Sequence, residues 1–433
     1  MPQKQSRRKR GVFLSPLGWQ RLQSAERQAE IQDNQGNPYT LESLSTRTSL
    51  SPNTITKVRR RQAAVDRQTL EIYFGAFQLR LKPEDYQNID AVRELPSTGD
   101  NLPGQTVLGS PFYIERPRLE QICREALQQP GSLLHIRGTR QIGKTLLMAK
   151  TAAQQRTDTV ILNLKLADSN LLQDLGQFLR WFCSAVTHSL GRTDDERWQP
   201  LLGESFNCTA YFQALLSDLT GPLILALDDV DVLLRAPAIA TDFFNLIRAW
   251  HELAHYGDDR SHVWQRLRLL IVHTNEVYLS DWETPLPLGL GTVVDVPNFS
   301  QTQIVDLTHR YGLDRPEAVA EKLTHFLNGK PSLTQLALHH LQTHQLAIDT
   351  LTSSYLSPDS IFAEHLLYYL SRLQQYPDLL DSFQQVVQAD QPVILPPLQA
   401  YKLSRLGLIM GQGQMALPQC HLYRVYFSHV LYS

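Results

Sequence analysis

The stretch Gly138-Thr139-Arg140-Gln141-Ile142-Gly143-Lys144-Thr145 decides the fold. It matches GxxxxGK[ST], the pattern of a loop that binds nucleotide phosphates. Its glycines let backbone N–H groups point at anionic oxygens, its lysine reaches the β- and γ-phosphates, and its threonine hydroxyl binds Mg²⁺. The apolar run Leu133–Ile136 precedes the loop and the helical run Leu146–Gln154 follows it. The sequence therefore predicts an ATP and Mg²⁺ site in a loop between a strand and a helix, with Leu146 included.

Further strands are predicted on both sides of this helix. Several are apolar runs without alternation, which is typical of parallel strands buried on both faces. Longer helical patterns, such as Leu171–Leu190 and Ala238–Tyr256, lie between them. This order predicts an α/β P-loop NTPase core with a parallel sheet. The candidate strands are Ser132–Arg137, Thr159–Leu164, Leu223–Asp228, Leu267–His273 and Thr292–Val296.

One of these strands ends in two carboxylates, Asp228 and Asp229. An unpaired charge at the end of a buried strand is costly, so the pair indicates a function. We expect Asp228 to hold Mg²⁺ together with Thr145, and Asp229 to orient or deprotonate the attacking water. The alternative is that the acids cap the next helix. Aspartate is shorter than the glutamate common in fast P-loop ATPases, so we expect slow hydrolysis of ATP to ADP and phosphate.

A third strand, Leu269–His273, ends in Thr274-Asn275-Glu276. A polar residue here would sit between the ends of the other two strands and sense the γ-phosphate. We assign this role to Asn275, with Lys144, Asp228 and Asp229 as the other catalytic residues. Ordinary turn residues at a strand end are the alternative.

The charge of the chain is divided unevenly along its 433 residues. The net charge is −2, yet the first 87 residues hold 15 Lys and Arg against 8 Asp and Glu. The remainder holds 26 against 35. A basic N-terminal region followed by an acidic remainder is typical of a nucleic-acid-binding domain joined to a second functional domain. No apolar run approaches the ~18 residues of a membrane span, no signal peptide is evident, and four dispersed cysteines fit a reducing cytoplasm.

Composition divides the chain into six predicted segments. The residues Pro96, Gly99, Pro103 and Gly104 and a scarcity of large apolar residues mark a linker. Strands give way to helices after about residue 300. The segments are a basic tail (1–10), an all-α helix-turn-helix domain (11–87), a linker (88–107), the ATPase core (108–299), a helical lid (300–350) and a winged-helix domain (351–433).

The segment Leu41–Arg60 fits a helix-turn-helix. Its fifth position is the small Ser45, its ninth is Ser49 where glycine is usual, and Ser51-Pro52 starts the second helix. The exposed face of that helix would contact DNA, because asparagine and arginine read base edges while lysine and arginine neutralise phosphates. A helical protein–protein adaptor is the alternative. The DNA-binding candidates are Asn53, Thr54, Lys57, Arg60 and Arg61.

The C-terminal segment ends in a helical run, Ala400–Leu406, followed by a short hairpin around Gly411–Gly413. A helix followed by a small hairpin is the pattern of a winged helix. Its basic residues are few. In STAND proteins, which this chain resembles through the stretches given below, such a domain closes over the nucleotide, and the small number of basic residues favours that role over DNA binding.

Together these residues resemble the cyanobacterial AAA-like ATPase family, in the STAND and origin-recognition branch of P-loop NTPases. The resemblance implies that Ile114 and Arg116 lie beside the adenine. It also implies that Gly329-Lys330-Pro331 is the Gly-x-Pro element of the lid, with Pro331 near the base or ribose. The stretches that carry it are Pro111–Glu120, Gly138–Thr145, Asn163–Asp168, Leu227–Asp231, Val272–Tyr278 and Cys420–Phe427.

Two departures from this family bear on activity. The family usually shows Asp-Glu where this chain has Asp228-Asp229, and the helix Ser332–His344 contains no arginine, so an AAA+ second sensor is missing there. Both favour a slow switch over a motor. The N-terminal stretches Gly11–Gly18 and Val65–Leu70 resemble a module of cyanobacterial conflict-system proteins associated with vWA and MoxR partners, and phage-repressor modules are similar.

The sequence thus predicts an ATP-binding STAND-like switch with a DNA-binding head, in a signalling or defence role. We expect ATP to change its conformation, to permit self-assembly, or to recruit a partner protein that acts in trans. Three alternatives stay open: an AAA+ regulator that assembles on DNA, a nucleotide-sensing transcription regulator, and an adaptor whose head binds protein.

Overall fold

The computed structural model divides the chain into two compact units, Met1–Asp100 and Asn101–Ser433. It describes residues 12–14, 19, 21–22, 25–26, 29, 33, 39–60, 65–82, 85–88, 111–193, 198–259, 261–276, 290–353, 355–357, 359–412 and 415–431. The predicted tail and nearly all of the predicted linker lie outside these residues.

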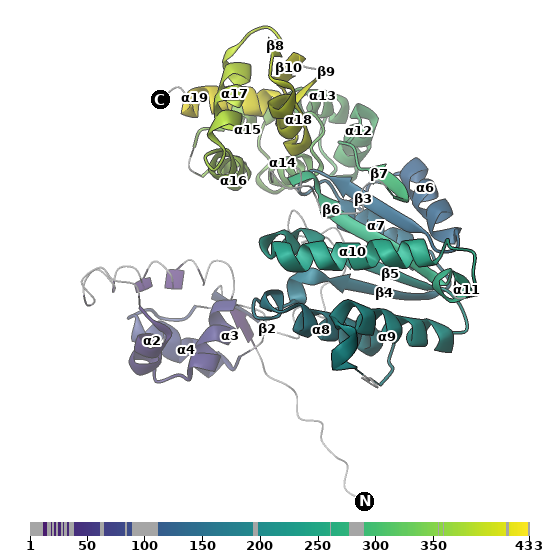
Figure 1. Cartoon of the computed structure of the whole chain (residues 1–433). Coiled ribbons are helices and arrows are strands. Elements are labelled where there is room, and N and C mark those ends of the chain that lie inside the picture. Colours follow the sequence, from purple (N-terminus) through teal and green to yellow (C-terminus); the bar gives the residue numbers. More distant parts are fainter. Residues whose placement is uncertain are drawn as a thin grey trace, which may run out of the picture. The chain divides into compact units, whose positions relative to one another are not determined.

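The first unit contains helices around a small apolar core (Figure 1). Helix α2 (Leu41–Thr48) ends at Ser49, whose left-handed backbone (φ 58°) turns the chain toward α3 (Pro52–Arg60). The Ser51 hydroxyl accepts a hydrogen bond from the Thr54 N–H at 3.2 Å and so caps α3. Helix α4 (Arg67–Ala76) completes the core. The buried core residues are Val12, Leu22, Ala29, Leu44, Ile55, Val58, Leu70, Tyr73, Phe74 and Phe77.

The expectation that this unit is all-α is wrong. Strands β1 (Val12–Leu14) and β2 (Tyr86–Asn88) pair antiparallel and close the unit. Each strand has three residues, which is too short for a period-two pattern. The two strands are also far apart in the sequence, near the beginning and the end of the unit. Such a pairing depends on tertiary contacts rather than on local sequence.

The second unit is built on a five-stranded parallel sheet with the order β4-β5-β6-β3-β7. The predicted strands are confirmed to within about a residue at most ends. Strand β5 is buried at all six positions, as the absence of alternation indicated. The strands are β3 (Leu133–Gly138), β4 (Asp158–Asn163), β5 (Leu223–Asp228), β6 (Leu267–Thr274) and β7 (Thr292–Asp295).

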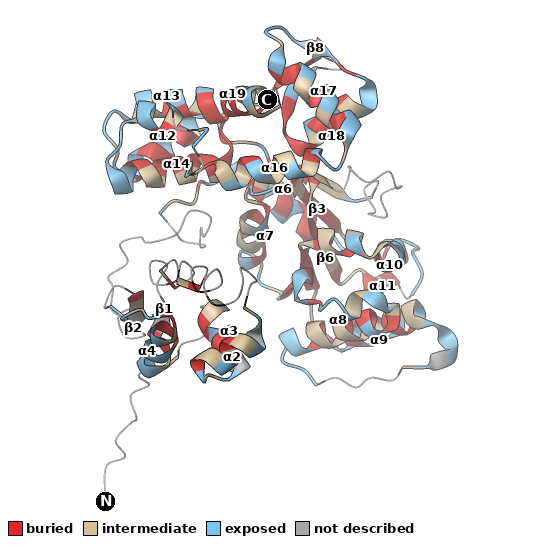
Figure 2. Cartoon of the chain, turned by 90° about the vertical axis from the view of Figure 1, so that its left-hand side faces the viewer, coloured by how far each residue is buried: buried red, intermediate tan, exposed pale blue. Residues whose placement is uncertain are grey.

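Helices cover both faces of this sheet, and the strands are mostly buried between them (Figure 2). One face packs against α6 (Pro117–Gln128) and α7 (Lys144–Ala153). The other face packs against α8 (Leu175–Ser189), α9 (Glu204–Asp218) and α10 (Pro237–Leu253), with the short α11 (Ser261–Trp264) beside them. Short 3-10 turns follow β4 and β5, at Leu164–Leu166 and Val230–Arg235, and two more lie at Leu171–Gln173, before α8, and Pro200–Leu202, before α9.

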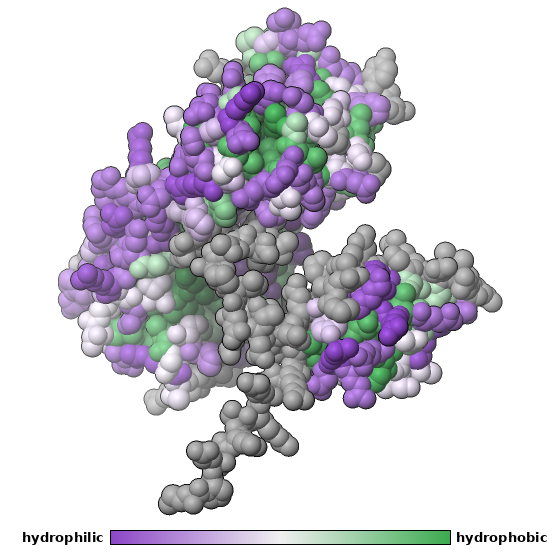
Figure 3. Space-filling model, turned by 180° about the vertical axis from the view of Figure 1, so that it is seen from behind, coloured by the Kyte–Doolittle hydropathy of each residue, from purple (hydrophilic) through white to green (hydrophobic). Residues whose placement is uncertain are grey.

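After β7 the chain forms a helical region that shares one hydrophobic core from Phe299 to Phe427, and Ile114 belongs to the same core. A three-stranded antiparallel sheet, β8-β10-β9, lies among its last helices. Figure 3 shows hydrophobic areas on this upper part of the molecule within a largely hydrophilic surface. None of the helices in the described ranges is both long and apolar enough to cross a membrane. The elements are α12 (Gln301–Arg310), α13 (Pro316–Leu327), α14 (Pro331–His344), α15 (Ile348–Ser353), α16 (Ala363–Leu373), α17 (Pro377–Gln388), β8 (Val393–Ile394), α18 (Pro397–Leu406), β9 (Ile409–Gln412), β10 (Met415–Pro418) and α19 (His421–Val430).

Candidate nucleotide site

The predicted phosphate loop joins β3 to α7, which begins at Lys144. Gly143 turns the chain into the helix with a left-handed backbone (φ 100°), a conformation that side chains with a Cβ rarely adopt. The Lys144 ammonium donates hydrogen bonds to the carbonyl oxygens of Gly138, at 3.3 Å, and Thr139, at 2.9 Å. The lysine thus lies folded over the loop, where phosphates would be bound.

Burial and neighbouring acids act on Lys144 in opposite directions. The residue is 8% exposed, and burial lowers the pKa of its ammonium, whereas Asp231, Asp228, Glu276 and Asp229 favour the charged form. The remaining loop residues differ in exposure. Arg140, Gln141 and Thr145 are exposed, Thr139 and Leu146 are half-buried, and Ile142 is buried.

Thr145 and Asp228 lie together at the carboxyl edge of the sheet. The Thr145 hydroxyl donates to the Asp228 Oδ2 at 3.0 Å and lies 3.3 Å from Oδ1. Burial raises the pKa of Asp228, and Asp229 adds to this, because each disfavours the charged form. A hydroxyl and a carboxylate in contact are hard oxygen donors of the kind that Mg²⁺ prefers, so these two residues fit the metal that the loop implies.

Asp229 points to a different set of partners. Its backbone is left-handed (φ 54°), its Oδ2 accepts a hydrogen bond from the Asn163 amide at 2.8 Å, and its Oδ1 lies 2.8 Å from the Lys165 ammonium. Asn163 is the last residue of strand β4, and Lys165 follows the strand. The carboxylate that the sequence predicts to act on water is therefore already engaged at both oxygens.

Strand β6 lies between β3 and β5, as predicted, and carries Asn275 just beyond its end. Asn275 is 8% exposed, and its Oδ1 has no hydrogen-bond partner among the described residues. A buried amide oxygen without a partner is unfavourable in isolation and suits a residue that meets a ligand.

Sequence reasoning missed Asp231, which fixes the end of β6. Its carboxylate accepts from the Thr274 N–H, at 3.0 Å, and from the Thr274 hydroxyl, at 3.1 Å. Burial raises the pKa of Asp231 to about 6. The second acid after β5 could have been noticed in the sequence, but only the pairing of strands reveals its partner.

A polar pocket of about 390 Å³ lies beside the loop and extends to the helical region. Its most buried cation is Lys330, which is 5% exposed, and burial lowers the pKa of this lysine to about 8. Its ammonium lies 5.1 Å from the centroid of the Tyr423 ring. The lining residues are Gly138, Thr139, Ile142, Asn275, Asp295, Val296, Pro297, Asn298, Asn328, Lys330, Ser404, Gly407 and Gln419.

The residues assigned to adenine by resemblance occupy the borders of this site. Ile114 packs in the core of the helical region. The Arg116 guanidinium donates to the carbonyls of Pro297, at 2.7 Å, and Ile142, at 3.2 Å, and so ties the loop to the end of β7. Pro331 starts α14 and is buried. Their contact with adenine stays a prediction.

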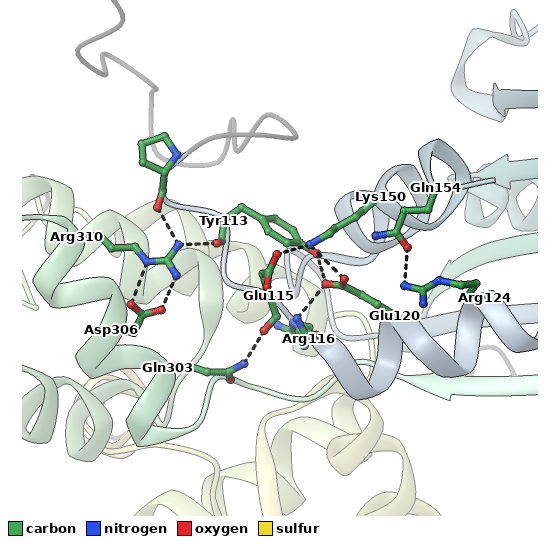
Figure 4. Close-up of polar contacts among 11 residues, drawn as sticks. Tyr113, Glu115, Arg116, Glu120, Arg124, Lys150, Gln154, Gln303, Asp306 and Arg310 are labelled. Carbon is green, nitrogen blue, oxygen red and sulfur yellow. Dashed lines mark hydrogen bonds and ion pairs between the residues drawn. The ribbon is translucent and has the colours of Figure 1, made fainter. Parts of the chain in front are cut away.

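The segment before α6 connects the loop helix with the helical region (Figure 4). Lys150 of α7 lies 2.9 Å from Glu115 and 3.1 Å from Glu120, and Arg310 of α12 donates to the Tyr113 carbonyl at 2.8 Å. The Tyr113 hydroxyl donates to Glu120 at 3.0 Å. These contacts hold the segment from Tyr113 to Glu120 against both α7 and α12.

The predicted DNA-contacting residues belong to the first unit and are described in part. Lys57 is exposed and Thr54 is half-buried on α3. Asn53 and Arg60 lie on the same helix, but their side chains are not described, and Arg61 lies outside the described residues.

Comparisons with known proteins agree with this fold. A family model described as an AAA-like domain matches residues 102–429. A Walker-type ATPase of Pyrococcus abyssi is similar in structure, with a TM-score of 0.50, 15% identity, and coverage of 73% of this chain and 96% of that one. No protein with a curated description matches the sequence.

Two further solved structures are more distant. The ORC1 protein of Aeropyrum pernix, solved in complex with DNA, has a TM-score of 0.37 and 13% identity, with coverage of 74% of this chain and 94% of that one. A signal transduction ATPase with numerous domains from Pyrococcus horikoshii has a TM-score of 0.30 and 17% identity, with coverage of 73% and 42%.

Proposed function

Because the chain belongs to the AAA-like domain family, we propose that it is an ATP-binding switch whose first unit binds DNA. The observation that supports nucleotide binding best is the meeting of Lys144, Thr145 and Asp228 where β3 and β5 end. A lysine folded over a phosphate loop and a hydroxyl–carboxylate pair are the parts needed to hold a Mg²⁺–nucleotide.

In this proposal the loop backbone and Lys144 bind the phosphates, and Thr145 and Asp228 hold Mg²⁺. The metal, when bound, neutralises charge on the phosphate oxygens. Asp229 orients water, and Asn275 senses the terminal phosphate. We expect turnover to be slow, because both oxygens of Asp229 are engaged by Asn163 and Lys165.

DNA binding is proposed for α3. The sharp turn at Ser49, the cap at Ser51 and the exposed Lys57 support a helix-turn-helix. The excess of basic residues in residues 1–87 supports an acidic partner such as DNA. The three-stranded sheet made by β8, which precedes α18, and by β9 and β10, which follow it, similarly supports a winged helix in residues 351–433, which would close over the nucleotide.

The coupling of the two activities is tested by ATP turnover, with and without duplex DNA, in wild type and Lys144→Ala. Stimulation by DNA that disappears in the variant supports a coupled switch. ATP binding with turnover that ignores DNA would contradict the coupling and would point to a protein or small-molecule trigger. Regular filaments on DNA with ATP, seen by electron microscopy, would favour an assembling regulator.

The DNA surface is tested separately by titrating duplex DNA at several salt concentrations. Replacing Lys57 by alanine should weaken binding to all sequences and lower the salt slope by about one. Arg67→Ala is the matched control, since Arg67 is exposed on α4 and pairs with Glu71 at 3.0 Å. Equal affinity of wild type and Lys57→Ala would contradict this surface.

A further inference from the structure

Helix α16 of the helical region reaches two parts of the nucleotide site through one side chain, Tyr368. Its hydroxyl donates a hydrogen bond to the Glu276 Oε2 at 2.6 Å. The Arg140 guanidinium lies over its ring, 4.2 Å from the centroid. Glu276 follows the β6 strand and Arg140 belongs to the phosphate loop, so Tyr368 bridges the loop, the sheet edge and α16.

The bridge is partly supported by a second residue of α16. Arg372 lies 3.8 Å from the same Oε2 of Glu276. The other oxygen of Glu276 is buried without a hydrogen-bond partner among the described residues. Glu276 is therefore held mainly by the Tyr368 hydroxyl, and loss of this contact would leave a buried carboxylate poorly satisfied.

The terminal phosphate of ATP would compete with the Tyr368 ring for the Arg140 guanidinium. Asp228, Asp229, Asp231 and Glu276 all act on Lys144, so the site is rich in carboxylates before any phosphate enters. ATP brings a further negative group beyond the two phosphates of ADP. Arg140 is the exposed cation of the loop, and a phosphate is a stronger partner for its guanidinium than an aromatic ring.

We propose that Arg140 exchanges the Tyr368 ring for the terminal phosphate of ATP, and that this exchange loosens the attachment of α16 to the nucleotide site, which then rests on the contacts of Tyr368 and Arg372 with Glu276 alone. ADP, which lacks that phosphate, leaves Arg140 on Tyr368 and α16 held. The device rests on the proposed nucleotide site and adds to it the residues that distinguish ATP from ADP.

Two substitutions should have opposite effects on ATP affinity, measured by calorimetry with ATP and with ADP. Tyr368→Leu removes the partner that competes with phosphate, so ATP should bind about tenfold more tightly while ADP binding stays unchanged. Arg140→Met removes the phosphate partner, so ATP should bind about tenfold more weakly, again without change for ADP.

Two further variants guard against loss of folding and nonspecific effects. Tyr368→Phe keeps the ring and removes only the hydroxyl bond to Glu276, so it should shift ATP affinity in the same direction by a smaller factor. Tyr376→Phe is the matched control, since its hydroxyl makes no hydrogen bond to another described residue, and it should leave both affinities unchanged.

Hydrogen exchange of the amides in Ala363–Leu373 provides a second readout. In wild type these amides should exchange faster with ATP than with ADP, and in Arg140→Met the two nucleotides should give the same rates. If wild type binds neither nucleotide, the proposed site itself is wrong. If both bind but the ATP-to-ADP ratio is the same in all variants, the nucleotide site stands and the loosening of α16 is overturned.

Discussion

The Thr145 hydroxyl lies 3.0 Å from the Asp228 Oδ2, although their strands are not neighbours in the sheet. Strand β6 separates β3, which leads to Thr145, from β5, which ends at Asp228. The contact exists because parallel strands open toward a crevice at their carboxyl ends, where loops from separate strands converge. The β6 end between them is where Asn275 lies.

Loss of the Asp228 carboxylate should remove the advantage that Mg²⁺ gives to ATP binding. We expect Asp228→Asn to bind ATP equally well with Mg²⁺ and with EDTA, whereas Mg²⁺ should tighten ATP binding by wild type about tenfold or more. Titration of a fluorescent ATP analogue under both conditions measures this. Asp218→Asn, on the exposed end of α9, is the control. A preserved Mg²⁺ effect in Asp228→Asn would contradict the metal assignment.

Substitution of Asp229 should lower the rate of ATP hydrolysis without weakening ATP binding. We expect Asp229→Asn to lose at least about tenfold of the hydrolysis rate, because an amide cannot accept a proton from water, while ATP affinity changes little. The check is release of phosphate measured beside equilibrium ATP binding. Unchanged turnover in this variant would show that another group acts on the water.

The core could be predicted from the sequence where local pattern and chemistry agree. The run Leu223–Asp228 is apolar at every position before the acid, and it becomes a strand buried on both faces. The loop at Gly138–Thr145 can be recognised equally well from the sequence, because phosphate binding requires particular residues at particular spacings. The sequence could therefore assign candidate site residues to these two elements, and the structure brings Thr145 and Asp228 into contact.

Contacts between distant elements could not be predicted. Three such contacts join residues at least 43 positions apart. They are the pairing of β1 with β2, the hydrogen bonds of Asp231 with Thr274, and the hydrogen bond of Tyr368 with Glu276. None of these has a periodic signature. They depend on tertiary packing, which a single sequence does not display.

Gly329 should be intolerant of any side chain. Its backbone is left-handed (φ +67°), and an added Cβ would lie 2.1 Å from the Phe299 carbonyl oxygen. We expect Gly329→Ala to lower the free energy of unfolding by about 3 kcal/mol. Gly312→Ala has a similar φ of +66° with open space around it, so its cost should be about 1 kcal/mol. Urea denaturation compares the two, and equal costs would contradict the steric argument.

Lys330 should make the free energy of unfolding depend on pH in the alkaline range. Burial lowers its pKa from 10.5 to about 8 in the folded chain. Between these values the unfolded state binds more protons, so the free energy of unfolding rises with pH, by about 3 kcal/mol in total from this group. Lys330→Met should lack this rise. Denaturation of both proteins between pH 7.5 and 10 tests it, and parallel curves would contradict a buried, charged lysine.

Equilibrium ATP binding by Lys144→Ala tests most directly whether Gly138–Thr145 binds the phosphates of ATP. Lys150→Ala is the control, because Lys150 lies on the same helix but contacts Glu115 and Glu120 instead of the loop. We predict that Lys144→Ala loses at least about tenfold in ATP affinity while Lys150→Ala stays close to wild type. Wild-type affinity in Lys144→Ala would contradict the site.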